Sequence, residues 1–187
     1  MPQTFGLWPS NARSIFDLLN KNDNANLRSM PFWSKKKVKI KNMDGPVSEI
    51  SDLLYLDPKN ETPSQDFFNI ERMNFSIESL EHLMAYLDKI RSLSLPSNQM
   101  SIVIIRTGAY LGEVLRNNCT RGLSWTDFAS GAEDSEFIKN LGMSINTALM
   151  LKDSKQYLFP MAKVQKYLHS QESDDLTHYA ITIIRMS

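Results

Sequence analysis

The chain lacks most of the features that mark secreted or membrane proteins. Its 187 residues include a single cysteine, Cys119, so an intramolecular disulfide framework is excluded and a reducing compartment is favoured. The first residues, Met-Pro-Gln-Thr-Phe-Gly-Leu-Trp-Pro, have neither the charged nor the apolar region of a secretory signal. No apolar run approaches the roughly 20 residues needed to span a bilayer. We therefore expect a cytoplasmic protein with no membrane span.

The chain also lacks net charge, because 21 basic and 21 acidic residues cancel and the isoelectric point is near 6.8. Nucleic-acid binders need a basic excess for phosphate contacts, so the composition argues against nucleic acid as a partner. The cancellation hides an asymmetry: residues 1–47 carry five surplus positive charges and residues 48–187 five surplus negative ones. We expect a basic, aromatic N-terminal segment over 1–47 and an α+β body over 48–187, within a single domain overall.

Residue patterns typical of catalytic, metal and nucleotide sites are missing as well. The histidines His82, His169 and His178 are far apart in the sequence, and there is no P-loop or Gly-x-Gly-x-x-Gly pattern. Cys119 has no histidine near it in the sequence, so nucleophilic catalysis by this thiol is not supported. These observations lean against an enzyme, and we expect no catalytic residues, no metal and no cofactor.

Two helices are predicted in the middle of the chain. Ser76 is suited to cap a helix whose apolar residues recur at helical spacing up to Ile90. Pro96 ends that helix, and Ser97 or Asn98 is expected to cap a second helix over about 99–118. Together they predict an antiparallel helical hairpin.

The rest of the body is expected to supply the sheet. Residues 123–128, 146–151 and 178–185 are predicted as strands, the last on its Tyr-Ala-Ile-Thr-Ile-Ile sequence. A helix is predicted after Phe159-Pro160, a polar loop over 129–134, and a connector with turns over 42–75. The predicted fold class is α+β, with the helical hairpin packed on a small, mostly antiparallel sheet and an irregular N-terminal extension.

The second hairpin helix contains two glycines in the sequence Arg106-Thr-Gly-Ala-Tyr-Leu-Gly-Glu-Val-Leu-Arg116. Each costs roughly 1 kcal/mol relative to alanine inside a helix, so their placement needs a reason. Gly108 and Gly112 are four residues apart and share one face. We expect close packing there by another backbone or by a bulky aromatic residue such as Trp125.

Polar residues lie on a second face of this helix, at Arg106, Tyr110, Glu113 and Arg116. The flanking residues are strongly apolar, so a carboxylate here must find a partner or become protonated. One interpretation is a buried ion pair in which Arg106 or Arg116 neutralises Glu113. Glu113→Gln would then destabilise the fold by about 3–5 kcal/mol if a charged partner were left buried alone. The alternative is a pocket in which Glu113 acts as an acid or base, or in which the arginines bind an anion.

The string Arg-x-Gly-Ala-Tyr-x-Gly-Glu-x-x-Arg, followed by Trp125 and Phe159-Pro160-x-x-Lys-Val-x-Lys-Tyr-Leu, resembles an uncharacterised bacterial protein family. That family is built around a GAYLGEV helix and is seen as small stand-alone proteins. The resemblance covers about residues 98–185, leaves 1–75 outside, and implies a bacterial protein of no settled activity. The motif positions that it carries over are Gly108, Tyr110, Gly112, Glu113, Arg116, Trp125, Phe159 and Pro160.

Aromatic and basic residues of the N-terminal segment are candidates for contact with another protein, because aromatic residues and methionine are enriched at binding surfaces. The lysine run from residue 35 to 41 has a second interpretation, since its alternation also fits a charged edge strand. We expect a non-catalytic protein-binding protein of adaptor, secretion-chaperone or immunity type. The alternative is a small enzyme or anion-binding protein that uses the polar helix face. The partner-binding candidates are Trp8, Phe32, Trp33, Lys35, Lys36 and Lys37.

Overall fold

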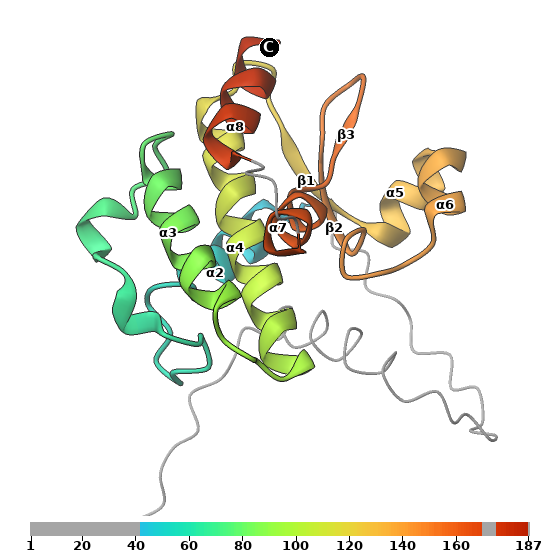
Figure 1. The fold of residues 1–187 in the computed structure, drawn as a ribbon. Coiled ribbons are helices and arrows are strands. Elements are labelled where there is room, and N and C mark those ends of the chain that lie inside the picture. Colours follow the sequence, from blue (N-terminus) through green and yellow to red (C-terminus); the bar gives the residue numbers. More distant parts are fainter. Residues whose placement is uncertain (1–41, 170–174, 187) are drawn as a thin grey trace, which may run out of the picture. The chain divides into compact units, whose positions relative to one another are not determined.

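Helix α4 (Ser97–Asn118) lies at the centre of the fold and packs against α2 (Asp44–Asp52) and α7 (Pro160–His169), as Figure 1 shows. The computed structural model describes residues 42–169 and 175–186, and residues 42–187 form one compact unit. The described residues contain seven α-helices and one three-stranded antiparallel sheet. The predicted α+β class, a helical hairpin with a small antiparallel sheet, is confirmed. Residues 1–41 of the predicted N-terminal extension lie outside the described residues.

The helical hairpin consists of α3 (Ser79–Arg91) and α4, with Pro96 directly before the first residue of α4. Ser76 acts as expected in part: its hydroxyl accepts a hydrogen bond from the Ser79 backbone N–H at 3.3 Å, although the α-helix begins only at Ser79. Neither Ser97 nor Asn98 caps α4, because the helix begins at Ser97. Although α4 has 22 residues, no helix in the described ranges is long and apolar enough to cross a membrane.

Residues 42–75 are more than the predicted connector, because they begin with helix α2. Pro46 is compatible with this helix since it lies in the first turn, where a backbone N–H is not needed for helical bonding. The Asn42 side chain accepts a hydrogen bond from the Asp44 N–H at 2.8 Å, and Val47 and Ile50 are buried. Helix α2 passes through residue 47, where the sequence placed the boundary of the body. After α2 the chain forms an irregular segment with two short 3₁₀ helices, η1 (Gln65–Phe67) and η2 (Ile70–Arg72).

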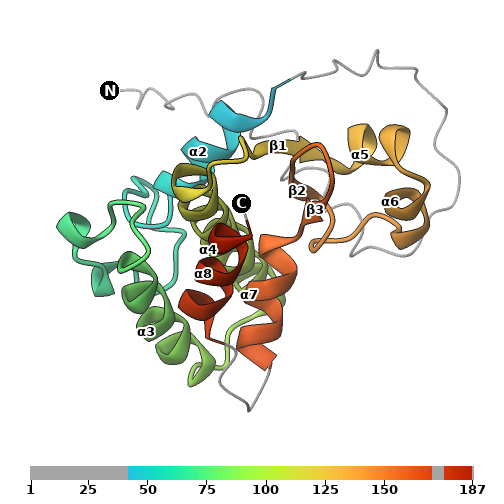
Figure 2. The same cartoon turned by 90° about the horizontal axis from the view of Figure 1, so that it is seen from above.

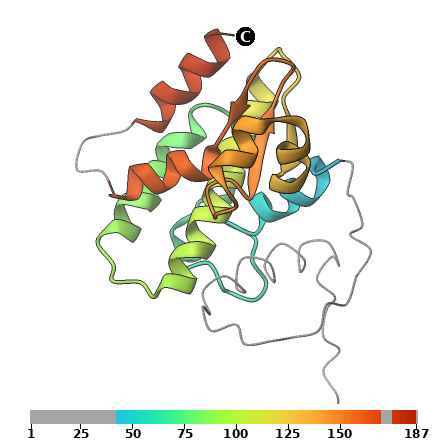
Figure 3. The same ribbon diagram turned by 90° about the vertical axis from the view of Figure 1, so that its right-hand side faces the viewer.

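The sheet has the strand order β1 (Ser124–Asp127), β2 (Leu149–Lys152), β3 (Tyr157–Leu158), and both pairings are antiparallel. Figure 3 shows it in front of α4, with α7 running across the helix below the strands. In the register of the sheet, Trp125 is opposite Leu151. The predicted strands at 123–128 and 146–151 correspond to β1 and β2, whereas β3 has only two residues and gave no signal in the sequence.

The predicted loop at 129–134 is wrong, because α5 (Phe128–Asp134) occupies it and α6 (Glu136–Leu141) follows. Polar composition suggested a loop, but each helix has its own N-terminal cap. The Asp127 carboxylate accepts from the Ser130 N–H at 2.7 Å, and the Ser135 hydroxyl accepts from the Ile138 N–H at 3.5 Å. Capping satisfies backbone donors that a short helix otherwise leaves open. Figure 2 shows α5 and α6 projecting beyond the sheet, away from α3 and α8.

The strongest strand prediction, over 178–185, is also wrong, because helix α8 (Leu176–Arg185) occupies these residues. The Asp175 carboxylate caps this helix by accepting from the backbone N–H groups of Thr177 and His178. Its buried residues, Leu176 and Ala180, are four apart, which is a helical period and places them on one face. Helical spacing and a strong cap therefore outweighed the β propensity of the isoleucines and threonine. The predicted helix after Phe159 is confirmed as α7.

Candidate functional site

Except for Arg116, the candidate residues of α4 lie on the part of the helix that is buried on all sides. Every residue from Val103 to Leu115 is buried, including Arg106, Thr107 and Glu113 among the apolar ones. A charged group buried in this way costs several kcal/mol unless ion pairs and hydrogen bonds compensate it. The partners of each polar side chain therefore show whether that side chain stabilises the fold or is available for chemistry.

The two glycines of α4 allow close approach, as their spacing suggested. A Cβ atom at Gly112 would lie 2.2 Å from the Trp125 ring, and one at Gly108 would lie 2.9 Å from the backbone of Met161. Both distances are shorter than Cβ contacts in folded proteins allow. Gly112 therefore accommodates the indole of β1, and Gly108 accommodates the first turn of α7.

Glu113 is held by two neighbours. Arg116 forms a bidentate pair with it, at 3.0 Å from Nε to Oε1 and 2.8 Å from Nη2 to Oε2. The Trp125 indole N–H also donates to Oε1 at 2.7 Å. The hydrogen bond to Glu113 is the main reason that the pKa of Arg116 lies above its ordinary value, against the opposing effect of burial. Asp44 extends the cluster, because its carboxylate accepts from the Trp125 backbone N–H at 2.7 Å.

Arg106 is fully buried and is held by the segment that follows α2. Its Nη1 donates to Asp57 Oδ2 at 2.5 Å, to the Leu53 carbonyl at 3.1 Å and to the Thr62 hydroxyl, and its Nη2 lies 3.2 Å from Glu61 Oε2. The Nε of Arg106 has no hydrogen-bond partner among the described residues. This guanidinium therefore organises a loop from a distant part of the sequence.

Asp57 has a second role, because it also closes the loop around Arg106. Its carboxylate accepts from the backbone N–H groups of Lys59, Glu61 and Thr62 at 2.6–3.0 Å. Burial alone would raise the pKa of Asp57, but the hydrogen bond from Arg106 and the backbone hydrogen bonds outweigh it, so the pKa lies below its ordinary value. The carboxylate is therefore charged at neutral pH and neutralises the buried arginine.

Tyr110 belongs to a third set of contacts. Its hydroxyl donates to Ser79 Oγ at 2.8 Å and accepts from the Phe75 N–H at 3.2 Å, and the two rings stack with centroids 4.9 Å apart. Phe75 has a φ of 60°, a left-handed conformation that is unfavourable for a bulky residue. Asn118 fixes the same turn by donating to the Phe75 carbonyl at 2.9 Å. Burial raises the pKa of Tyr110, which keeps its hydroxyl protonated.

The polar residues that the sequence placed on one face of α4 therefore have separate sets of partners. Glu113 meets Arg116 and Trp125, whereas Arg106 meets Asp57 and the loop that follows it. Of the two arginines weighed as partners of Glu113, Arg116 is the one that pairs with it. The described residues give no observation of a shared pocket containing all four. The partner-binding candidates Trp8, Phe32, Trp33, Lys35, Lys36 and Lys37 lie outside the described residues.

The residues that complete these contacts gave no functional signal in the sequence. Asp57 precedes Pro58, a combination typical of a turn within the predicted connector, but its carboxylate also reaches Arg106, 49 positions away. Phe75 and Asn118 gave no signal, because a positive φ at a phenylalanine is not encoded by residue type. A group of three or more metal-ligating side chains is absent from residues 42–169 and 175–186.

Comparisons with protein-family models, curated proteins and solved structures each give no match. The resemblance to a bacterial family therefore rests only on its motif residues. In the structure several of these residues touch one another: Trp125 and Pro160 both lie against Gly112. The motif describes how β1 and α7 pack on α4, and the function has to be argued from the surface of the molecule.

Proposed function

We propose that this chain is a non-catalytic bacterial protein that binds another protein, in an adaptor, secretion-chaperone or immunity role. The observation that carries the proposal is the apolar surface of the α5–α6 projection. Phe137 is 62% exposed, Leu141 48% and Met143 40%. Phe137 and Leu141 are four apart on α6 and share a face. Exposed apolar residues gathered in this way are characteristic of protein-binding surfaces.

The polar residues of α4 support the same proposal in a different way. Arg106, Tyr110 and Glu113 each have partners inside the fold, which leaves them as structural groups. The alternative of a small enzyme or anion-binding protein needs Glu113 beside both arginines and Tyr110, and no observation favours it. A cytoplasmic location is part of the proposal and rests on the lone cysteine, which is buried and in no disulfide.

The experiment is affinity purification of the tagged full chain from the source organism, followed by mass spectrometry. We expect one protein to co-purify with the wild type and to be lost with a Phe137→Ser/Leu141→Ser variant. Met186→Ser is the matched control, because Met186 is 64% exposed on another element and should leave recovery unchanged. Absence of any partner above background would contradict the proposed function, and unchanged recovery with the double variant would contradict the assignment to α6.

A further inference from the structure

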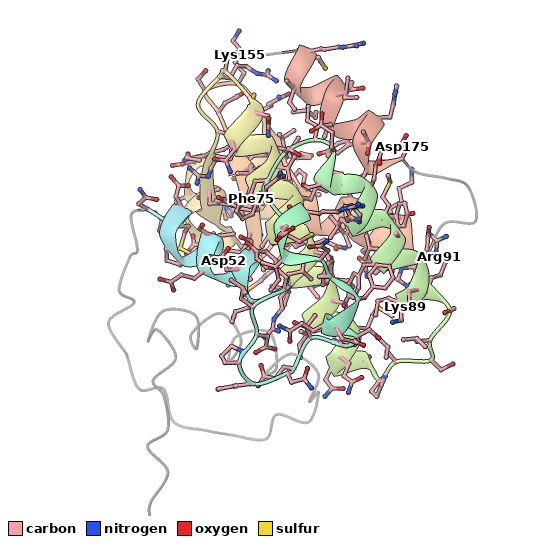
Figure 4. All side chains as sticks on the ribbon, turned by 90° about the vertical axis from the view of Figure 1, so that its left-hand side faces the viewer. Asp52, Phe75, Lys89, Arg91, Lys155 and Asp175 are labelled. Carbon is pink, nitrogen blue, oxygen red and sulfur yellow. The ribbon has the colours of Figure 1, made fainter. Side chains whose placement is uncertain are left out.

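Residues 63–72 form an outer stretch of the irregular segment, and none of them is buried. The residues on either side are buried, because Thr62 is 1% exposed and Met73 is 4% exposed. This stretch contains both short 3₁₀ helices, η1 and η2. Figure 4 shows the side of the molecule on which the segment between α2 and α3 faces the viewer. We call residues 63–72 the strap.

The strap covers Tyr86, a residue of α3. The Tyr86 hydroxyl donates to the Pro63 carbonyl at 2.8 Å. Its ring centroid lies 4.5 Å from that of Phe68 and 6.3 Å from that of Phe67. Although no residue of the strap is buried, Tyr86 beneath it is 0% exposed. The strap therefore shields a buried aromatic side chain.

The other contacts of the strap also go to α3. Arg72 Nη1 lies 2.9 Å from His82 Nε2, and Lys89 Nζ lies 5.1 Å from the centroid of the Phe67 ring. Because His82, Tyr86 and Lys89 follow one another at helical spacing, they lie on one face of α3. Among the described residues, no hydrogen bond, ion pair or ring contact joins the strap to another α-helix or to a strand. Separation of the strap from α3 therefore breaks no such contact elsewhere.

The chain on both sides of the strap is held by α4 instead. Before the strap, the Arg106 guanidinium bonds to the Thr62 hydroxyl and to Asp57. After the strap, the Tyr110 hydroxyl accepts from the Phe75 N–H at 3.2 Å. Parts of a fold with few buried contacts open more readily than parts that are tied to the core. We therefore expect both flanking regions to stay closed when the strap opens.

Ser64 provides a hinge near the start of the strap. Of the described residues other than glycine, those with a positive φ are Asn60, Ser64 and Phe75, and the φ of Ser64 is 53°. This left-handed conformation is unfavourable for serine, and hinges are positions at which φ and ψ change. The Ser64 side chain does not cap η1, so it makes no capping bond that would offset the strain. Opening of the strap therefore releases this strain.

We propose that the strap opens from α3 as a unit, swings at Ser64 and acts as a gate over Tyr86. In the open form the Phe68 ring leaves Tyr86, and an aromatic surface on α3 becomes accessible. A molecule that contacts this surface binds only the open form and shifts the population toward it. The strap lies on α3, away from the α5–α6 projection (Figure 2), so this conformational change goes beyond the function proposed above.

Amide hydrogen exchange of the full chain, followed by NMR, tests whether the strap opens as a unit. The N–H groups of Phe67, Phe68 and Arg72 donate to carbonyls within the strap. We expect these three groups to share one opening constant. After correction for intrinsic rates they should exchange at least about 100-fold faster than the Thr62 N–H, because local opening needs less free energy than opening of the core. The Thr62 N–H donates to Asp57 at 3.0 Å and reports on the loop that stays closed.

Two variants should change the opening in opposite directions. Tyr86→Phe removes the hydrogen bond to Pro63, so the strap N–H groups should exchange roughly fivefold faster. Ser64→Gly relieves the left-handed strain, because glycine adopts this φ freely, and should slow the exchange roughly threefold. The matched control is Tyr167→Phe, which removes a tyrosine hydroxyl that donates to Asp88 of α3 at 2.9 Å and should leave the exchange of the strap unchanged. Unchanged circular dichroism shows that each variant is folded.

Nitration of tyrosine by tetranitromethane, measured by mass spectrometry, tests whether the opening uncovers Tyr86. Tyr110 is the internal control, because it is also 0% exposed but stacks on Phe75, outside the strap. We expect Tyr86 to be nitrated at least about tenfold faster than Tyr110, since local opening exposes only Tyr86. The nitration of Tyr86 should be slower in Ser64→Gly.

Four results would overturn the proposal. The strap N–H groups exchange independently of one another, or they exchange as slowly as the Thr62 N–H. Tyr86→Phe and Tyr167→Phe have the same effect on the strap, or Tyr110 is nitrated as fast as Tyr86. None of these measurements involves Phe137 or Leu141, so failure here leaves the function proposed for the α6 surface untouched.

Discussion

Two buried charges on the same helix are neutralised in opposite ways. Glu113 finds its cation three residues along α4, at Arg116, and completes its contacts with the indole of Trp125. Arg106, two turns earlier, finds its carboxylate in Asp57, which belongs to a loop 49 positions away. The Glu113 pair reaches the surface, because the Arg116 side chain is 28% exposed, whereas neither Arg106 nor Asp57 exceeds 1%.

This difference separates two structural roles. A pair formed within one helix is present whenever the helix is, so Glu113 and Arg116 mainly orient Trp125 against Gly112. A pair formed across the sequence exists only when the loop is closed, so Arg106 makes the order of residues 53–62 depend on the core. Breaking a fully buried pair leaves a charge that water cannot reach, and this costs more than breaking a pair with one exposed partner.

The largest effect is expected from Arg106→Met, which keeps an apolar stem and removes the charge. The Asp57 carboxylate then stays buried without its cation, and we expect a loss of about 3–5 kcal/mol in the free energy of unfolding. Urea denaturation followed by circular dichroism measures this loss. Arg72→Met, at an exposed arginine, is the control and should change stability by less than about 0.5 kcal/mol. A loss below about 1 kcal/mol for Arg106→Met would show that the two pairs do not differ.

A smaller effect is expected from Gly112→Ala, which acts on the Glu113 side of the comparison. The added Cβ would lie 2.2 Å from the Trp125 ring, so the indole must move and its hydrogen bond to Glu113 lengthens. Overpacking of this kind costs about 1–3 kcal/mol. Gly45→Ala is the matched control, because nothing lies within 4 Å of a Cβ there and alanine favours the helix. The thermal unfolding temperature should fall for Gly112→Ala and should stay level or rise for Gly45→Ala.

The difference between the Glu113 and Arg106 pairs also explains which contacts can be predicted from the sequence. The hairpin, the close packing of Trp125 against Gly112, and Arg116 as one of two possible partners of Glu113 could be predicted, because spacing along a helix determines which residues share a face. The partners of Arg106 were not accessible, since no spacing rule connects Asp57 or Thr62 to residue 106.

Capping explains the errors in secondary structure. Asp127 and Asp175 cap helices α5 and α8, and their carboxylates accept from backbone N–H groups two or three residues later. Composition alone suggested a loop in one case and a strand in the other. Propensity is a weak preference that a cap and tertiary packing can override. The exposed residues of α6 proposed here as a binding surface gave no signal, because exposure of an apolar residue depends on what the fold leaves uncovered.

Glu113→Gln should cost less than the sequence alone suggested. The estimate of about 3–5 kcal/mol assumed that a charge is left buried by itself, but Arg116 is 28% exposed and can be hydrated. The glutamine still offers one oxygen to the Trp125 indole, so we expect a loss of about 1–2 kcal/mol, the size of a charged hydrogen bond. Glu136→Gln removes another i,i+3 pair, Glu136–Lys139, in which both side chains are exposed, and should cost less than about 0.5 kcal/mol. Equal losses for the two variants would remove the distinction between a half-buried and an exposed pair.

The smallest effect is expected from mild acid, and it tests the Arg106 side of the comparison without breaking it. The pKa of Asp57 is lower in the folded chain than its ordinary value of 3.8, so the unfolded chain takes up the proton more readily. The stability that Asp57 contributes is therefore complete above that ordinary value and is lost as pH falls through the lowered, folded pKa. Denaturation curves between pH about 6 and about 3 should show this loss in the wild type. The acid dependence should be flatter in Arg106→Met, because Asp57 then lacks the cation that holds its pKa down. Equal slopes would mean that the backbone N–H groups alone keep Asp57 charged, and the buried arginine would then be held by the loop without stabilising its carboxylate.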